Sequence, residues 1–155
     1  MTEISDLLVP EAVVTGMSAA TKKTLFQQLG AAAARAYGLD AAEVAARLSE
    51  REKLGSTGFG GGIAIPHGKL EGLKGVCGVF ARLNKPVDFA AVDDMPVDLV
   101  FMLMSPTGAG ADHLKALACV SRKLRDRAFA AKLRGAGSDD AVFVLLNGVE
   151  ARDAA

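Results

Sequence analysis

The sequence is poor in the features that mark several functional classes. Lysine plus arginine equals aspartate plus glutamate at 18 each, so the formal net charge is zero. This balance argues against a duplex nucleic-acid binder, which needs a basic face. No apolar run reaches the roughly 18 residues of a membrane span. The N-terminal stretch also lacks the basic and long apolar regions of a signal peptide, so we expect no membrane insertion.

Cysteine and histidine are scarce, with two of each among 155 residues. Cys77 and Cys119 lie in apolar surroundings and match no metal-binding spacing. We interpret them as buried, reduced thiols of a cytoplasmic protein. The scarcity of histidine directs attention to His67 and His113 as candidate functional residues.

The length fits one domain, which we place over residues 1–155 with a core at about 4–148. Hydrophobic residues make up 50% of the chain and charged residues 23%, which is typical of an ordered globular protein. Helical and strand-like segments alternate in places. The sequence therefore predicts an α/β fold: a mixed β-sheet with helices on both faces.

Apolar periodicity and capping residues predict two helices in the first third of the chain. Ser18 caps the first, which ends at Gly38. Asp40 and Glu43 open the second, which carries Arg51 in its last turn.

Three more helices are predicted in the last third. Asp112 caps one of them, and another runs from about Asp126 to Arg134. The segment 141–146 suits a strand by composition, but Ser138 before it indicates a helix, which we favour. The expected inward positions of the first of these three helices are Leu114, Leu117, Val120 and Leu124.

Short apolar runs predict strands at 63–65, 76–83 and 97–104, the last stopped by Ser105 and Pro106. A glycine-rich loop, 55–62, precedes the first of them. Its order, helix then glycines then strand, is the reverse of a Rossmann fingerprint, and no Walker A pattern is present. Two histidines lack a third metal ligand at a fitting spacing, and no nucleophile elbow occurs.

His67 remains as a candidate nucleophile that attacks phosphorus. An imidazole near its ordinary pKa of about 6.5 is largely unprotonated at cytosolic pH. Phosphoryl transfer also needs donors and cations, which the glycine loop, Arg51 and His113 can supply. The alternative is that His67 is a satisfied polar residue, Arg51 a solvated side chain and the glycines a turn.

Two ordered blocks, REKLGSTG (51–58) and GIAIPHGKL (62–70), carry a family resemblance. Together with PVDLVF (96–101) and DHL (112–114), they resemble enzyme IIA domains of the bacterial phosphoenolpyruvate-dependent phosphotransferase system. The likeness is to the fructose/mannitol class, and most closely to its nitrogen-regulatory branch. It covers nearly the whole chain.

The resemblance implies a phosphotransferase that works through a phosphohistidine and needs no cofactor. His67 corresponds to the residue that accepts a phosphoryl group from a histidine phosphocarrier protein (HPr/NPr-like). His113 corresponds to the family's second active-site histidine, and Arg51 to the arginine of its R-E-x-x-G-S-T block. We expect the phosphate to be bound by Thr57, Gly58 and Gly68. Family members often carry Asn or Glu at the position of Gly61. Any hydrogen bond that such a side chain makes to the histidine must here come from Thr57, water or the backbone.

Two outputs are consistent with this resemblance. The sequence contains no fused IIB or IIC part, which favours a regulator whose phosphorylation state controls binding to target proteins such as sensor kinases or potassium transport components. The alternative is a sugar-specific IIA component that passes phosphate to a IIB protein. In either case we expect an apolar docking face around His67, with Phe59 exposed on it.

Overall fold

One mixed sheet forms the centre of the molecule. The computed structural model describes residues 2–148, and within that range six strands are hydrogen-bonded in the order β1-β5-β6-β3-β2, with β4 also on β6. β6 (Val97–Pro106) is flanked on one side by antiparallel β5 (Cys77–Val87). On its other side, β3 (Ile63–Ala64) and then β4 (His67–Leu70) run parallel to it, one after the other. The predicted mixed sheet is confirmed.

Three further strands, not predicted from the sequence, complete the sheet. β1 (Val13–Met17) pairs in parallel with β5, and β2 (Gly58–Gly60) pairs antiparallel with β3. β2 reads GFG, a composition typical of turns, and β4 contains a glycine and an exposed lysine. β2 and β4 are held by their neighbours rather than by their own propensity, so the sequence did not predict them.

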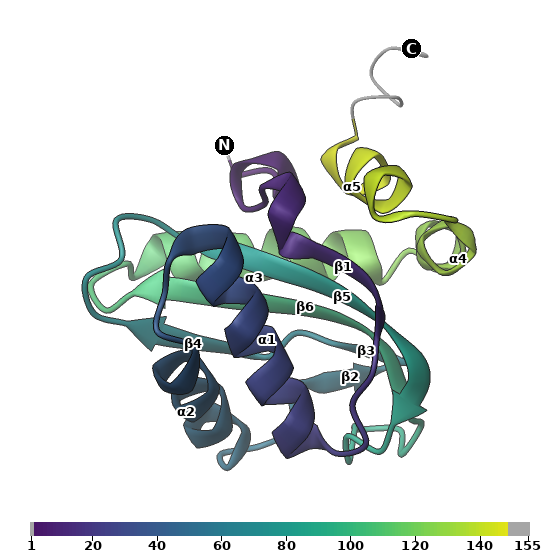
Figure 1. Cartoon of the computed structure of the whole chain (residues 1–155), viewed down its shortest axis with the longest axis horizontal. Helices are drawn as coiled ribbons and strands as arrows, with labels where there is room; N and C mark the ends of the chain where they lie inside the picture. Colours follow the sequence, from purple (N-terminus) through teal and green to yellow (C-terminus); the bar gives the residue numbers. More distant parts are fainter. Residues whose placement is uncertain (1, 149–155) are drawn as a thin grey trace.

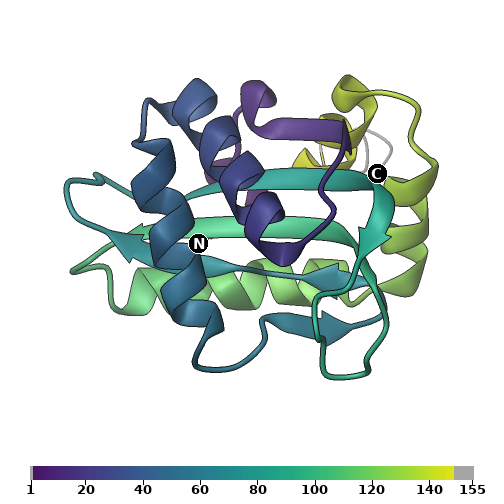
Figure 2. The same ribbon diagram turned by 60° about the horizontal axis from the view of Figure 1, so that its bottom comes forward.

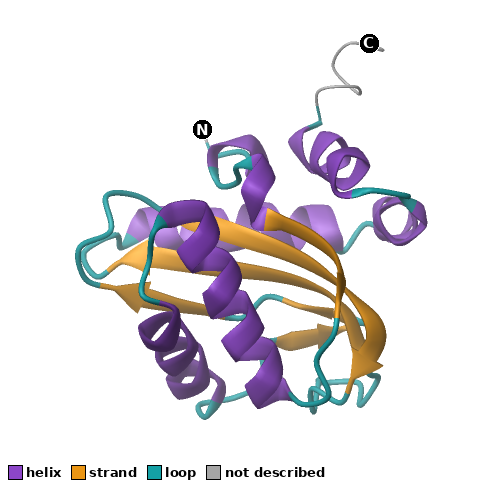
Figure 3. Ribbon diagram, viewed as in Figure 1, coloured by secondary structure: helices purple, strands orange, loops and turns teal. Residues whose placement is uncertain are grey.

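Helices cover both faces of the sheet, as predicted (Figures 1 and 2). α1 (Lys22–Tyr37) and α2 (Ala41–Glu52) lie across one face, and α3 (Ala111–Leu124) lies across the other. The chain then turns toward the β1 edge through α4 (Arg127–Gly135) and α5 (Asp139–Asn147). Helices therefore lie on both faces of the sheet and beside its β1 edge (Figure 3). Two short 3-10 turns, η1 and η2, precede β1 at Ile4–Asp6 and Pro10–Ala12.

Most helix ends follow the predicted capping chemistry. Gly38 ends α1 in the left-handed conformation, with φ of 72°. The carboxylate of Asp40 accepts the N–H of Glu43 at the start of α2. Ser138 likewise accepts the N–H of Ala141, which confirms α5 as a helix. Asp126 caps α4 in the same way. The expected Ser18 cap is wrong, because Thr21 caps α1.

The inward face of α3 differs from the predicted one. Asp112 does not cap the helix, because it already lies in the first turn and Gly110 is the N-cap residue. Leu114 is 67% exposed. The buried residues of α3 are His113, Ala116, Val120 and Leu124. A buried histidine therefore occupies the position on which the apolar pattern would place a leucine.

The core lies along β6, which is covered by helices on both faces. Each residue from Leu99 to Met104 is fully buried, and Ser105 continues the strand with no exposed surface instead of ending it. Cys77 is buried as expected, whereas Cys119 is only half-buried, and both are free thiols. None of the helices in residues 2–148 is long and apolar enough to cross a bilayer.

Candidate functional site

His67 is the first residue of β4, on the side of that strand that faces α3. In a strand, alternate residues point to opposite faces, so His67 and Lys69 share one face and Gly68 takes the other. A Cβ atom on Gly68 would lie 3.2 Å from Cβ of Arg47 in α2. Gly68 therefore allows α2 to pack closely on β4, and the histidine is directed away from α2.

A backbone hydrogen bond fixes the protonation pattern of His67. Its Nδ1 lies 2.9 Å from the carbonyl oxygen of Ile65. A carbonyl can only accept, so Nδ1 carries the proton and the neutral ring keeps a lone pair on Nε2. Burial lowers the pKa of His67 below 6.5, and the positive charge of Arg51 lowers it further, against the raising effects of the Ile65 carbonyl and Glu52. The ring is thus held in its neutral, nucleophilic form.

His113 meets His67 from the first turn of α3. The two ring centroids are 5.4 Å apart and their planes are tilted by 55°. His113 is 8% exposed, and its Nδ1 lies 2.5 Å from Oγ of Ser105. Burial lowers the pKa of His113, and the charges of His67 and Lys69 act in the same direction. The structure therefore brings together the two histidines that the sequence singled out.

Arg51 supplies a positive charge beside this pair. It lies in the last turn of α2, where Nη1 donates to the carbonyl of Gly55 at 2.9 Å. This bond ties the guanidinium to the start of the glycine-rich loop, and its charge is close enough to lower the pKa of His67. A guanidinium has five N–H donors in a planar fork, which suits a phosphoryl group.

A buried ionic network, not predicted from the sequence, anchors the loop behind His67. The Glu52 carboxylate, 6% exposed, accepts from Nζ of Lys22 at 2.9 Å and from the Thr57 hydroxyl at 2.6 Å. The Thr57 carbonyl in turn accepts the N–H of Ile65 at 3.1 Å. A chain of bonds thus runs from Lys22 to Ile65, whose carbonyl holds His67. Glu52 adjoins Arg51 in the REKLGSTG block, which was the only signal available for it.

Gly58 and Gly61, two of the glycines of the loop, have structural partners of their own. The N–H of Gly58 donates to Oγ of Ser56 at 3.1 Å, and a Cβ on Gly58 would lie 2.8 Å from Cβ of Ala91. Gly61 has φ of 68° at the β2–β3 turn, where its N–H donates to Asp93 and its carbonyl accepts from Arg134. Of the expected sources of a hydrogen bond to His67, the structure shows a backbone one: the carbonyl of Ile65 lies 2.9 Å from Nδ1.

Phe59 was expected to lie exposed beside His67, but the structure places it elsewhere. It is half-buried, with the guanidinium of Arg125 5.3 Å from its ring centroid. Arg125 is at the C-terminal end of α3, whereas His113 is in the first turn, about 18 Å away at the rise of an α-helix. The exposed leucine next to the histidine pair is Leu114.

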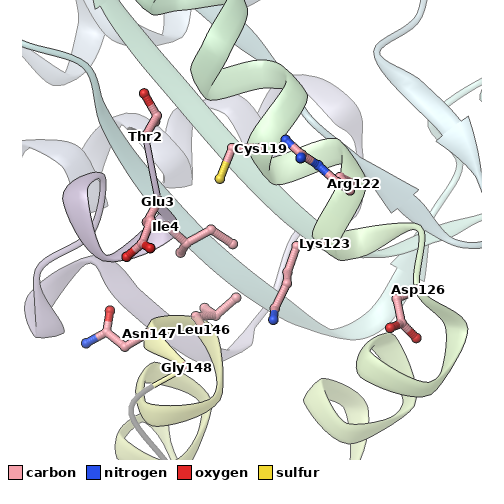
Figure 4. Close-up of a pocket in the computed structure, with 10 residues that line it drawn as sticks. All are labelled: Thr2, Glu3, Ile4, Cys119, Arg122, Lys123, Asp126, Leu146, Asn147 and Gly148. Carbon is pink, nitrogen blue, oxygen red and sulfur yellow. The ribbon is translucent and has the colours of Figure 1, made fainter. Parts of the chain in front are cut away.

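A pocket of about 520 Å³ lies away from the histidine pair, between η1, α3 and α5 (Figure 4). Ile4, Cys119 and Leu146 contribute apolar surface to it, and Lys123 extends across it. None of the predicted site residues lines this pocket. Among residues 2–148, no group of three His, Cys, Asp or Glu side chains is arranged to hold a metal ion.

Comparison with protein families gives one match over almost the whole chain. The family described as phosphoenolpyruvate-dependent sugar phosphotransferase system, EIIA 2, matches residues 6–149. The matched segment contains all the candidate residues described above.

Individual relatives and solved structures point in the same direction. A nitrogen regulatory protein of Bradyrhizobium diazoefficiens is 49% identical over 143 residues, covering 92% of this chain and 94% of that protein. A fructose-specific EIIA component of Haloferax volcanii is 37% identical over 145 residues, covering 92% and 93%. The crystal structure of the nitrogen regulatory protein IIA-Ntr from Neisseria meningitidis superposes with a TM-score of 0.86 at 38% identity, covering 92% of this chain and 98% of that one.

Proposed function

The chain belongs to the EIIA 2 family of the phosphoenolpyruvate-dependent sugar phosphotransferase system, and on that premise we propose that Nε2 of His67 accepts a phosphoryl group from a histidine phosphocarrier protein (HPr/NPr-like). The observation that carries this proposal is the hydrogen bond from Nδ1 of His67 to the Ile65 carbonyl. It leaves the Nε2 lone pair available at neutral pH, on a ring whose centroid is 5.4 Å from that of His113 and whose pKa is lowered by the charge of Arg51.

In the transfer step, the Nε2 lone pair forms a bond to phosphorus. The bond between phosphorus and the histidine nitrogen of the donor breaks, and its electron pair returns to the donor ring. Positive charge develops on the His67 ring as the bond forms, and the Ile65 carbonyl stabilises it through Nδ1–H. The oxygens of the phosphoryl group carry negative charge, which we assign to Arg51 and His113 for stabilisation.

Thr57, Gly58 and Gly68 support this site chiefly by shaping it. Thr57 links the loop to Glu52, and Gly58 lets the loop pack against Ala91. Gly68 follows the acceptor and allows α2, which carries Arg51, to approach β4. We propose that these three residues act by positioning the loop, α2 and β4 around His67, on whose Nε2 the phosphoryl group binds.

We further propose a regulatory output, supported by the 49% identity to a nitrogen regulatory protein. Phosphorylation adds up to about two negative charges to the surface at His67. A target that docks there, such as a sensor kinase or a potassium transport component, then binds one state in preference to the other. The likeness to a fructose-specific EIIA component supports a second candidate, transfer of the phosphoryl group to a IIB protein in sugar uptake.

The two outputs are separated by following phosphate and partners together. The protein is labelled from phosphoenolpyruvate through enzyme I and the phosphocarrier, and wild type, His67→Ala and His67→Asp are then used as bait in cell extract. A target that binds the Ala form, and is recovered in smaller amount on the phosphorylated protein, supports regulation. Label that passes to a IIB protein, with no state-dependent target recovered, supports transport instead. Absence of label on wild type contradicts both.

A further inference from the structure

We infer that Ser105 is a positioning residue, which holds the His113 ring with its proton on Nε2 so that this ring presents a donor toward the phosphoryl group on His67. The role in phosphoryl transfer rests on the proposed function, whereas the state of the ring follows from the contacts of Ser105 itself. Ser105 was expected only to end a strand, and nothing in its sequence context assigns it to the site.

The first step is the direction of the hydrogen bond between Ser105 and His113. Oγ of Ser105 lies 2.5 Å from Nδ1 of His113, and the serine has no exposed surface. Either group can donate in principle, because imidazole nitrogen and hydroxyl both do. In the described part of the chain, Nδ1 of His113 is the partner of the serine hydroxyl. If Nδ1 donated, the buried O–H would have no acceptor, which costs more than a made bond returns. The hydroxyl therefore donates, and Nδ1 accepts.

The second step is the consequence for the other ring nitrogen. Burial, together with the charges of His67 and Lys69, lowers the pKa of His113, so the ring is neutral at neutral pH. A neutral imidazole that accepts at Nδ1 carries its proton on Nε2. His67 has the opposite pattern, because the Ile65 carbonyl requires a proton on Nδ1. One ring thus offers a lone pair and the other an N–H donor.

This opposition suits a shared phosphoryl group. The acceptor ring needs a lone pair to form the bond to phosphorus, and the second ring needs a donor to stabilise the phosphoryl oxygens. With the reverse tautomer, His113 would direct a lone pair at negatively charged oxygens. The serine excludes that arrangement without placing a charge in the site.

The third step concerns the position of the rings. Ser105 belongs to β6, which also pairs with the β4 strand that carries His67: Leu103 is opposite His67, and Ser105 is opposite Lys69. A bond from Ser105 to His113 therefore fixes the α3 histidine to the same strand that places the acceptor. The relative position of the two rings depends on one fully buried segment of β6 instead of on the α3 N-terminal loop.

The test reads the ring nitrogens directly, by long-range ¹H–¹⁵N NMR of histidine-labelled protein at neutral pH. In wild type we expect the Nε2–H form for His113 and the Nδ1–H form for His67. In Ser105→Ala the His113 nitrogens should move toward the averaged shifts of a free imidazole, with His67 unchanged. Ser105→Thr, which keeps the hydroxyl, should restore the wild-type pattern. Ser121→Ala, a serine on the same helix as His113, is the control and should alter neither ring.

The phosphorylation rate gives a second readout on the same proteins. In single turnover, Ser105→Ala should transfer about tenfold more slowly than wild type or Ser121→Ala, because a donor is no longer held in place. A wild-type spectrum with the His113 proton on Nδ1 would overturn the inference, even if the Ser105 variants do not fold. Unchanged His113 shifts in a folded Ser105→Ala would overturn it as well. If wild type has the expected tautomers but accepts no phosphate, the proposed function fails and the assignment of the Ser105 bond stands.

Discussion

His67 and His113 face each other with ring centroids 5.4 Å apart, one from the start of β4 and the other from the first turn of α3. Each ring is held at Nδ1 by a different kind of group, a backbone carbonyl for His67 and a buried serine hydroxyl for His113. The pair therefore forms where the start of β4, which pairs with β6, meets the start of α3, which packs on β6. The expected effects of altering this arrangement follow from the partners of each ring.

Replacing His113 should separate its donor role from its packing role. His113→Ala removes a positioned donor, which costs about a hundredfold in transfer rate. Because the side chain is 8% exposed, the same change also leaves a cavity and lowers stability. His113→Gln keeps an N–H donor and should recover part of the rate. Single-turnover phosphorylation of both variants checks this, and a wild-type rate in His113→Ala would mean that the residue is structural.

Arg51→Lys should slow transfer although the charge is kept. The ammonium is a point charge that cannot bind two phosphoryl oxygens in a plane. It also cannot easily hold the Gly55 carbonyl, which Nη1 of Arg51 binds, and contact an anion at the same time. We expect a loss of about tenfold or more, measured as the rate of label uptake from the phosphocarrier. Arg35→Lys, on α1, is the matched control.

Breaking the ion pair of Glu52 should destabilise the loop behind His67. Lys22→Met leaves the buried carboxylate with only Thr57 as donor, and we expect a loss of about 1–2 kcal/mol in the free energy of unfolding, since Lys22 is partly exposed. Lys23→Met changes the adjacent exposed lysine and should have little effect. Equal free energies of unfolding for the two variants in urea would show that the ion pair does not contribute to stability.

Gly58→Ala distinguishes packing from phosphate binding. The new Cβ would lie 2.8 Å from Cβ of Ala91 and 3.0 Å from the Phe89 ring, so the loop must shift. Overpacking of this kind costs about 1–3 kcal/mol. Gly137→Ala, which meets open space, serves as the control. A slowed transfer rate without any loss of stability would instead indicate that the Gly58 backbone contacts the phosphoryl group.

Stability should fall as the pH is lowered below the ordinary histidine pKa of 6.5. Burial lowers the pKa of both His67 and His113 in the folded protein, so the unfolded chain binds more protons in the window just below 6.5. Their contribution is fully present above 6.5 and is lost as the pH falls toward the folded values. The charges of Arg51 and Lys69 add to this effect, and Glu52 opposes it. The free energy of unfolding is measured in urea at several pH values. It should depend less steeply on pH in the double variant His67→Gln/His113→Gln than in wild type.

The sequence predicted the parts of this site that are encoded by residue type. His67, His113 and Arg51 were identifiable because histidine is rare and because the glycine loop and capping residues place them near element ends. Helix ends were predictable from the cap residues Gly38, Asp40 and Ser138, since capping depends on nearby residues alone.

The parts that were missed depend on distant partners. Ser105 becomes a site residue only because α3 brings His113 beside it, and Glu52 only because α1 brings Lys22 to it. The face of α3 was mistaken for the same reason: the polar contact with Ser105 makes burial of His113 favourable, and this turns Leu114 outward. β2 and β4 exist because β3 and β6 offer unpaired edges to sequences with little strand propensity of their own.

The most direct measurement of the central claim is to locate the phosphoryl group at atomic level. Histidine-labelled protein is phosphorylated from phosphoenolpyruvate through enzyme I and the phosphocarrier, and the ¹⁵N–³¹P coupling is recorded by NMR, with His67→Gln as the control. The account predicts one coupled nitrogen, Nε2 of His67, with Nδ1 still protonated against the Ile65 carbonyl, and no signal in the variant. A phosphoryl group on Nδ1 of His67, on His113, or surviving in His67→Gln would contradict it.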